Sequence, residues 1–212
     1  PAAQRDAGRK VITIRELSER FDKEHISVRL KASTAKEYRR NLRRFILPAL
    51  GRLSVTEITR ADVAKLHHDL RHIPYQANRC LEVVSKMFNL AEMWGLRPDG
   101  SNPRKHIRKY PEEKRVRFLS AAELRGIGEV LREMECEGIE LTSAILAARL
   151  LILTGCRLNE IMTLKWEHVD LTETVLRLPD SKTGAKLVHF GLPAAELLEA
   201  AERIDDNSWV IF

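Results

Sequence analysis

Four short motifs constrain most strongly what this chain can fold into. Each has a hydroxyl residue followed three positions later by an acid, and each stands just before apolar residues at helical spacing. In such a capping box the hydroxyl accepts a hydrogen bond from a first-turn N–H, and the acid accepts one from the cap residue. The motifs pair Thr13 with Glu16, Thr34 with Glu37, Thr59 with Asp62, and Ser120 with Glu123. We therefore expect a mainly helical protein.

The apolar spacing places the expected helices. In the first half they cover about 13–26, 34–47, 59–72 and 75–94, and in the second half about 120–136 and 142–154, with a short amphipathic helix after Arg157 and another helix from Pro193. Residues 145–153 are apolar on almost every side, which predicts a helix buried in the middle of a domain.

One hairpin interrupts the helical pattern of the second half. Val175–Leu178 and Leu187–Leu192 are expected to form two antiparallel strands around the turn Ser181–Gly184. Alternation by two along the second strand predicts one shared side for Val188, Phe190 and Leu192.

The charge of the chain is unevenly distributed. The net charge is +6, but residues 1–118 hold 27 Lys and Arg against 14 Asp and Glu, whereas residues 119–212 hold 9 against 16. Such asymmetry favours a polyanion-binding module joined to a part with a different role. A basic face that is merely well solvated is the alternative.

Composition and breaks in periodicity predict the domain organisation. We expect an N-terminal tail at 1–11, a helical domain at 12–97, a basic linker at 98–118 and a second domain at 119–212. Pro103 and Pro111 prevent a continuous helix in the linker. The linker is either a solvated connector or a strap along a nucleic-acid backbone.

Several classes of protein are not expected. The longest apolar run is about half of the ~20 residues that cross a bilayer, so we expect a cytoplasmic protein without a membrane partner. The three cysteines, Cys80, Cys136 and Cys156, show no metal-binding spacing, which favours reduced thiols over a disulfide framework or a zinc site. We expect no metal and no cofactor.

The stretch "LILTGCRLNEI" at 151–161 contains the strongest candidate for a functional residue. Gly155 can end the apolar helix with a positive φ, and Arg157 then begins the next helix, where its planar fork suits two oxygens of one phosphate. Glu160 could orient the guanidinium. By spacing alone, an ordinary surface ion pair between these two residues is the alternative.

The segments around Arg157 resemble the tyrosine recombinases, the phage integrase family. "TGCRLNEI" at 154–161, "LKWEHVDL" at 164–171 and "DSKTGAKLVHFGLP" at 180–193 resemble the first catalytic box of that family and its hairpin. "STAKEYRRNLRRFILPALGRLSVTEITRADV" at 33–63 looks like the core-binding domain, and "RVRFLSAAEL" at 115–124 like the entry to the catalytic domain. The resemblance implies a helical core-binding domain and a truncated, mostly helical catalytic domain with a small antiparallel sheet.

The resemblance also implies roles for individual residues. Arg157 would grip the scissile phosphate, Glu160 would support it, and Lys182 on the hairpin would protonate the leaving 5′ oxygen. Lys186 lies four residues further on, and the choice between the two lysines stays open. Contacts to double-stranded DNA would come from the second and fourth helices, through Ser33, Thr34, Lys36, Arg40, Gln76, Asn78, Arg79 and Lys86.

The sequence departs from the family after the hairpin. The family continues with a His-x-x-Arg box, a second His or Trp, and the tyrosine that joins DNA covalently, whereas the tyrosines here are Tyr38, Tyr75 and Tyr110. We therefore expect a fragment that binds attachment-site DNA as a monomer but does not cut it. The parent would perform site-specific integration or excision as a tetramer on DNA.

Two other functions remain open at this point. A non-catalytic DNA-binding or regulatory protein could keep the integrase fold without its chemistry. A helical protein-interaction module with an incidental basic face would leave Arg157 and the hairpin unexplained.

Overall fold

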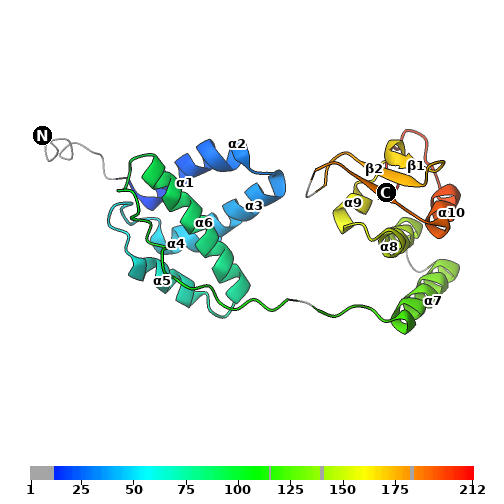
Figure 1. Ribbon diagram of the computed structural model, residues 1–212, viewed down its shortest axis with the longest axis horizontal. Coiled ribbons are helices and arrows are strands. Elements are labelled where there is room, and N and C mark those ends of the chain that lie inside the picture. Colours follow the sequence, from blue (N-terminus) through cyan, green and yellow to red (C-terminus); the bar gives the residue numbers. More distant parts are fainter. Residues whose placement is uncertain (1–11, 115, 139–140, 182–183) are drawn as a thin grey trace, which may run out of the picture. The chain divides into compact units, whose positions relative to one another are not determined.

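The computed structural model describes residues 12–114, 116–138, 141–181 and 184–212. The chain divides at residues 115 and 116 into two compact units (Figure 1), and each has its own apolar core. The expected fold class is confirmed, since helices dominate and one small antiparallel sheet lies in the second unit. None of the described helices has the length and apolar character needed to cross a membrane.

The first unit is a group of helices around one long helix, α6. Its elements are α1 (Ile14–Phe21), η2 (Asp22–Ile26), α2 (Ser27–Arg29), α3 (Ala32–Asn41), η3 (Leu42–Ile46), α4 (Leu47–Leu50), α5 (Arg60–Asp69) and α6 (Pro74–Met93). In Figure 1, α6 runs through the middle of the unit with α1, α3 and α5 around it. Its buried residues include Leu81, Val84 and Phe88, as their helical spacing predicted.

The helix predicted at 34–47 continues past residue 47 and consists of α3, η3 and α4. Pro48 lies inside the continuing helix, where its ring cannot accept ordinary α-helical geometry with the preceding turn. The chain widens there into the π-helical turn η3, and the N–H of Leu47 bonds the carbonyl of Leu42, five residues back. The helix then ends at Leu50.

Three of the four predicted capping boxes are present. Thr13 and Glu16 form one, in which the Glu16 N–H donates to Thr13 Oγ1 (3.3 Å) and the Thr13 N–H donates to Glu16 Oε2 (2.8 Å). The boxes at Thr59 and Ser120 have the same pattern. The box predicted at Thr34 is wrong, because α3 begins two residues earlier and its cap residue is Lys31, which places Thr34 in the first turn.

The chain after α6 turns back along that helix. We call residues 101–113 the return strap. It meets α6 in antiparallel order: Asn102 bonds the side chain of Asn89, Lys109 meets Glu82, and Tyr110 meets Asn78. This part of the predicted linker 98–118 is therefore packed against the helical unit, because apolar Ile107 and Tyr110 contact its core.

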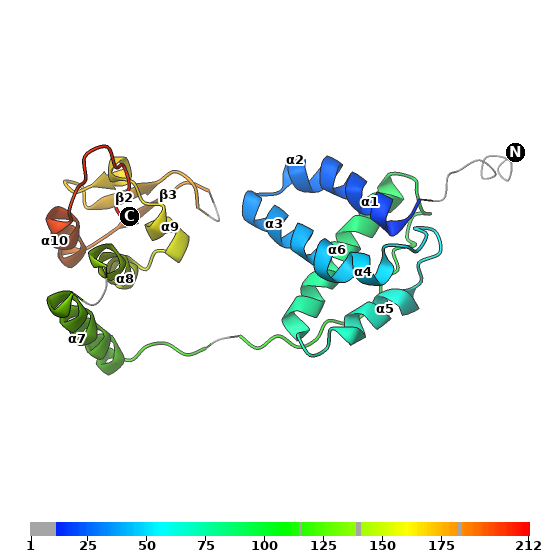
Figure 2. The ribbon, with the colours of Figure 1, turned by 180° about the vertical axis from the view of Figure 1, so that it is seen from behind.

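Among the described residues, the second unit combines four α-helices and one 3₁₀ helix with a three-stranded sheet. Its elements are α7 (Ala121–Glu137), α8 (Thr142–Thr154), α9 (Leu158–Met162), η4 (Trp166–His168), β1 (Val169–Asp170), β2 (Val175–Leu178), β3 (Lys186–His189) and α10 (Leu192–Ala200). The strands lie in the order β1, β2, β3 and are antiparallel. Figure 2 shows β2 and β3 from behind, near α9.

Two expectations for this unit are wrong in part. Helix α8 is not buried on all sides, since Leu150 is fully enclosed but Ile152 and Leu153 are 44% and 41% exposed. Its neighbours α7, α9 and α10 cover one side among the described residues. The second strand ends at His189, so Leu192 begins α10 and is exposed instead of sharing the buried side of Phe190.

The revised start of α3 predicts different costs for two threonine substitutions. Thr13→Ala removes a capping oxygen and should lower the free energy of unfolding by about 1 kcal/mol. Thr34→Ala is the matched control in the same unit, and it should change that free energy by less than about 0.5 kcal/mol because its position is inside the helix. Urea denaturation followed by circular dichroism measures both. Equal losses would contradict the cap at Lys31.

Candidate functional site

Arg157 stands at a sharp turn between two helices. Gly155 ends α8 with φ of 63°, a left-handed conformation that costs a residue without Cβ little. The backbone then leaves the helix, and Arg157 becomes the cap residue of α9. Its side chain is 51% exposed. The sequence therefore places one arginine, open to solvent, on a fixed turn.

The Glu160 carboxylate binds both the main chain and the side chain of Arg157. It accepts hydrogen bonds from the Arg157 main-chain N–H (Oε2, 2.9 Å) and from Arg157 Nη1 (Oε1, 2.8 Å). The Glu160 side chain is only 5% exposed. This burial distinguishes the pair from an ordinary surface ion pair, because a carboxylate out of water depends on its partners.

Lys186 is a third member of the site. It is the first residue of β3, and its Nζ lies 2.8 Å from Glu160 Oε2. Burial would raise the pKa of Glu160, but hydrogen bonds from Lys186 and Arg157 outweigh that effect and hold the pKa at about 2. The carboxylate is thus charged at neutral pH. Lys182, the other hairpin lysine, lies outside the described residues.

Two of the predicted DNA-contacting residues, Arg40 of α3 and Gln76 of α6, contact each other. Arg40 Nη2 donates to Gln76 Oε1 (2.8 Å), and Gln76 Nε2 in turn donates to the buried Asn41. Arg40 also pairs with Glu37 (2.7 Å). The other predicted residues of α3 are all exposed, namely Ser33, Thr34 and Lys36. Lys86 on α6 is half-buried.

Asn78 has a different environment from the one predicted. It is fully buried, and its Nδ2 donates to the carbonyl of Tyr110 (2.9 Å) and to Glu112 Oε1 (2.8 Å). Its Oδ1 accepts from the Tyr110 N–H (2.9 Å) and lies 3.2 Å from His67 Nε2. In this conformation the amide of Asn78 anchors the return strap and has no exposed surface for DNA.

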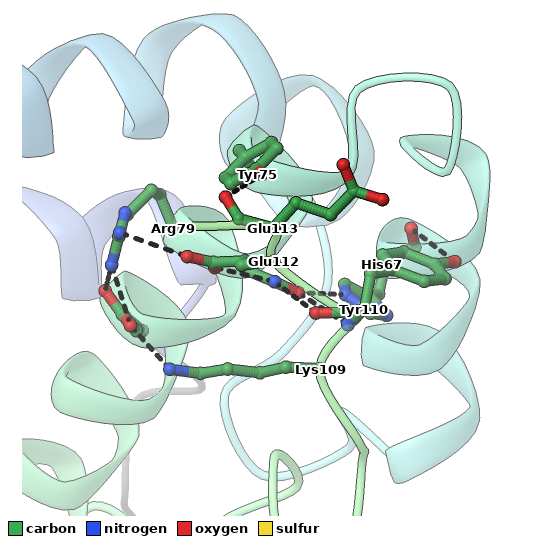
Figure 3. Close-up of polar contacts among 9 residues, drawn as sticks. His67, Tyr75, Arg79, Lys109, Tyr110, Glu112 and Glu113 are labelled. Atoms are coloured by element: carbon green, nitrogen blue, oxygen red, sulfur yellow. Dashed lines mark hydrogen bonds and ion pairs between the residues drawn. The ribbon is translucent and has the colours of Figure 1, made fainter. Parts of the chain in front are cut away.

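Arg79, the next predicted DNA-contacting residue, lies between two glutamates. Its guanidinium bonds Glu82 (3.0 Å), and it lies 3.6 Å from Glu112 of the return strap (Figure 3). Burial would raise the pKa of Glu82, but Lys109 and Arg79 lower it below its ordinary value. Arg79 is exposed yet already paired, so a phosphate would have to compete with carboxylates for it.

Sequence reasoning missed the strap residues that complete this cluster. The Tyr110 ring stacks on His67 with centroids 4.2 Å apart, and the Tyr75 hydroxyl donates to the carbonyl of Glu113 (2.8 Å) (Figure 3). The available signal was an aromatic residue and an isoleucine, Ile107, inside a segment that otherwise has the composition of a solvated linker.

Within the part of the chain that the structure describes, no group of three potential metal ligands is present.

Comparisons with known proteins agree with this fold. Residues 13–71 match the family described as "Phage integrase, N-terminal SAM-like domain". The chain is 28% identical over 172 residues to the prophage integrase IntZ of Escherichia coli K12, covering 79% of the chain and 42% of IntZ. It is 30% identical over 183 residues to the shufflon-specific DNA recombinase of Escherichia coli, covering 79% of the chain and 45% of that protein.

Solved structures show the same fold. The lambda integrase tetramer bound to a Holliday junction matches with a TM-score of 0.79 at 21% identity, over 100% of this chain and 62% of that one. The Tn1549 transposon integrase with circular intermediate DNA matches with a TM-score of 0.70 at 14% identity, over 94% and 68%. These matches support the tyrosine recombinase, or phage integrase, family for this chain. It spans less than half the length of the two curated relatives.

The low pKa of Glu160 predicts a pH-dependent contribution to stability. A carboxyl whose pKa falls from 4.5 to about 2 on folding stabilises the protein above pH 4.5 and loses that effect as the pH falls toward 2. Glu160→Gln should therefore lower the free energy of unfolding by up to about 3 kcal/mol at pH 7, and the deficit should shrink below pH 4.5. Denaturation from pH 2 to 7 tests this. A deficit independent of pH would contradict it.

The packed strap predicts a second effect. Tyr110→Ala removes the stack on His67 and should lower the free energy of unfolding by about 1–3 kcal/mol. It should also expose residues 101–114 to trypsin. Tyr75→Phe, which removes one exposed hydrogen bond, is the control and should change stability by less than about 1 kcal/mol. Equal trypsin resistance of wild type and Tyr110→Ala would show that the strap is held by other contacts.

Proposed function

We propose that the chain is part of a site-specific DNA recombinase that integrates or excises DNA by transesterification through a 3′-phosphotyrosine link. The observation that carries the proposal is the half-exposed Arg157 fixed on the buried carboxylate of Glu160. The relatives' names support it, since one is a prophage integrase and another a shufflon-specific recombinase.

The chemistry needs an arginine of this kind. Attack on a phosphodiester builds negative charge on the non-bridging oxygens, and a guanidinium already in place stabilises that charge more than it stabilises the ground state. Because Glu160 holds the Arg157 guanidinium through Nη1, little reorganisation is needed when the phosphate arrives. In this proposal Lys182 protonates the leaving 5′ oxygen, a role taken from the family resemblance.

Double-stranded DNA is the proposed partner of both units. Lys36 and Arg40 on α3 are exposed cations suited to phosphates, although Arg40 already pairs with Glu37, and Ser33, Thr34 and Lys86 belong to the same unit. Such contacts supply affinity without sequence information. Gln76 and Arg79 could read base edges only after giving up their present partners, Asn41 and the neighbouring glutamates.

The tyrosines of this chain do not supply an evident nucleophile. All three lie in the first unit, where Tyr110 stacks on His67, Tyr75 bonds the return strap and Tyr38 packs against the core. We therefore propose that the chain as given binds DNA as a monomer without cutting it, and that a longer protein acts as a tetramer on DNA. The lambda integrase tetramer on a Holliday junction is the structural precedent.

DNA affinity tests the role of Arg157. Arg157→Ala should weaken binding to duplex attachment-site DNA roughly three- to tenfold, because one charged phosphate contact among many is lost. Arg177→Ala is the matched control: it removes the same charge from an exposed β2 residue that pairs with Asp170. Fluorescence anisotropy at fixed salt measures both affinities, and melting curves check the fold. Equal affinities for the two variants would contradict the proposed site.

The covalent step is tested in the longest reading frame that contains this chain. A nicked suicide substrate should trap a protein–DNA adduct that disappears when the nucleophilic tyrosine is changed to phenylalanine. Tight DNA binding with no adduct would instead support a DNA-binding relative without catalysis.

A further inference from the structure

We infer that Lys186 is a positioning residue for the phosphate site: it acts on Arg157 through Glu160 and makes no contact with the phosphate itself. The inference rests on the proposed function. It also addresses a choice that the sequence left open, since Lys182 and Lys186 lie four residues apart on the same hairpin.

The geometry assigns Lys186 to Glu160. Its Nζ lies 2.8 Å from Oε2 of a carboxylate that is 5% exposed, and the lysine side chain itself is 30% exposed. A buried carboxylate is stabilised by each charged donor that reaches it. Moving the Lys186 ammonium away from Glu160 would therefore be energetically unfavourable. A lysine that protonates a leaving oxygen must instead direct its ammonium at the substrate.

The sheet fixes where Lys186 begins. In the register of the hairpin, Lys186 pairs with Leu178 and the next residue, Leu187, pairs with Arg177. The backbone of Lys186 is therefore held by β2, whose residues Leu176 and Leu178 are buried in the core of the unit. The side chain then crosses from the sheet to the start of α9, and it joins these two elements at the carboxylate.

The position of Lys186 determines how Arg157 meets Glu160. Oε2 is shared by the Arg157 main-chain N–H and the Lys186 ammonium, while the guanidinium meets Oε1 through Nη1. Arginine and carboxylate otherwise tend to form a two-bond fork that uses both oxygens and one full edge of the guanidinium. By occupying Oε2, Lys186 opposes that fork and keeps guanidinium donors available for two phosphate oxygens.

The net charge of the cluster formed by Arg157, Glu160 and Lys186 also favours phosphate binding. Arg157 and Glu160 alone form a neutral pair, whereas the three residues together carry one positive charge. A phosphate that approaches the half-exposed guanidinium therefore meets a cationic cluster. Without Lys186, Arg157 would be the one charged partner of Glu160 among these three residues. The carboxylate would then compete directly with the phosphate for the Arg157 guanidinium.

A double-mutant cycle in the full chain tests the inference. Lys186→Gln should weaken binding to duplex DNA roughly threefold, in the range of one partly exposed charge interaction, and Lys186→Arg should restore most of the affinity. In a Glu160→Gln background, where no carboxylate can form the fork, Lys186→Gln should have less than about half of that effect on the logarithm of the affinity. Thermal melting of each variant identifies any that fails to fold.

The cycle separates the possible roles of Lys186. An equal loss in both backgrounds would overturn the inference, because a lysine that touches the phosphate directly does not need Glu160. Failure of Lys186→Arg to restore affinity would also count against it, since an arginine at this position keeps a cation beside Oε2. Arg177→Gln serves as the charge-matched control variant outside the cluster.

A measurement without DNA keeps the inference separate from the proposed function. In a ¹³C NMR titration of the glutamate carboxyl groups, Lys186→Gln should raise the pKa of Glu160 from about 2 toward its ordinary value, and Lys186→Arg should leave it low. An unchanged Glu160 titration in Lys186→Gln would overturn the inference whatever the DNA result. If the wild-type chain did not bind DNA while the titration shifted as expected, the proposed function would fail and the Lys186–Glu160 link would stand.

Discussion

Helix α6 is buried over most of its surface, and the first unit is arranged around it. Its buried residues run from Ala77 to Ala91. A helix with so wide an apolar face is stable in water only when neighbours cover that face, and only a narrow polar side is left, formed by Arg79, Glu82, Lys86 and Asn89. Helices α1, α3 and α5 pack around it (Figure 1), and the return strap lies along it in the opposite direction. The strap is thus a consequence of the same requirement that assembles the helices.

The second unit depends on a buried charge. Glu160 is removed from water, which is tolerated because three donors from Arg157 and Lys186 converge on it. Those donors come from the turn before α9 and from the first residue of β3, so the hairpin and the helix must meet for the carboxylate to be satisfied. The same contact that completes the fold also orients the candidate phosphate-binding arginine. Stability and the proposed chemistry therefore use one set of hydrogen bonds.

Much of the fold could be predicted because its signals are local. Capping at Thr13, Thr59 and Ser120 depends on residues three positions apart, and the strand Val175–Leu178 is visible from its own residue types. Thr34 shows the limit of such signals. The capping-box pattern of Thr34 and Glu37 is present in the sequence, but the helix begins earlier, at Ala32, so Thr34 is not the cap residue. Pro48 shows another, because a wider turn let the helix continue where a stop was expected.

The contacts that sequence reasoning missed join distant residues. Lys186 meets Glu160 across 26 positions of sequence, and Asn78 meets Tyr110 across 32, so neither pair has a spacing that a local pattern could reveal. For Arg157 and Glu160, the spacing and the family resemblance suggested a contact, but the burial that distinguishes it from a surface pair required the structure.

The packed strap changes the length of the tether between the two units. If the whole segment 98–118 were free, the connection would have the statistics of a linker of some 20 residues, but with the strap attached as far as Glu113 the sequence left before the cap Ser120 is 114–119. For a flexible tether longer than the span between two sites, the effective concentration of one unit at its site falls with roughly the 3/2 power of tether length, so a shorter tether of that kind raises it. Two weak attachments to one DNA molecule would gain avidity from this loss of slack, with no additional contact to the DNA.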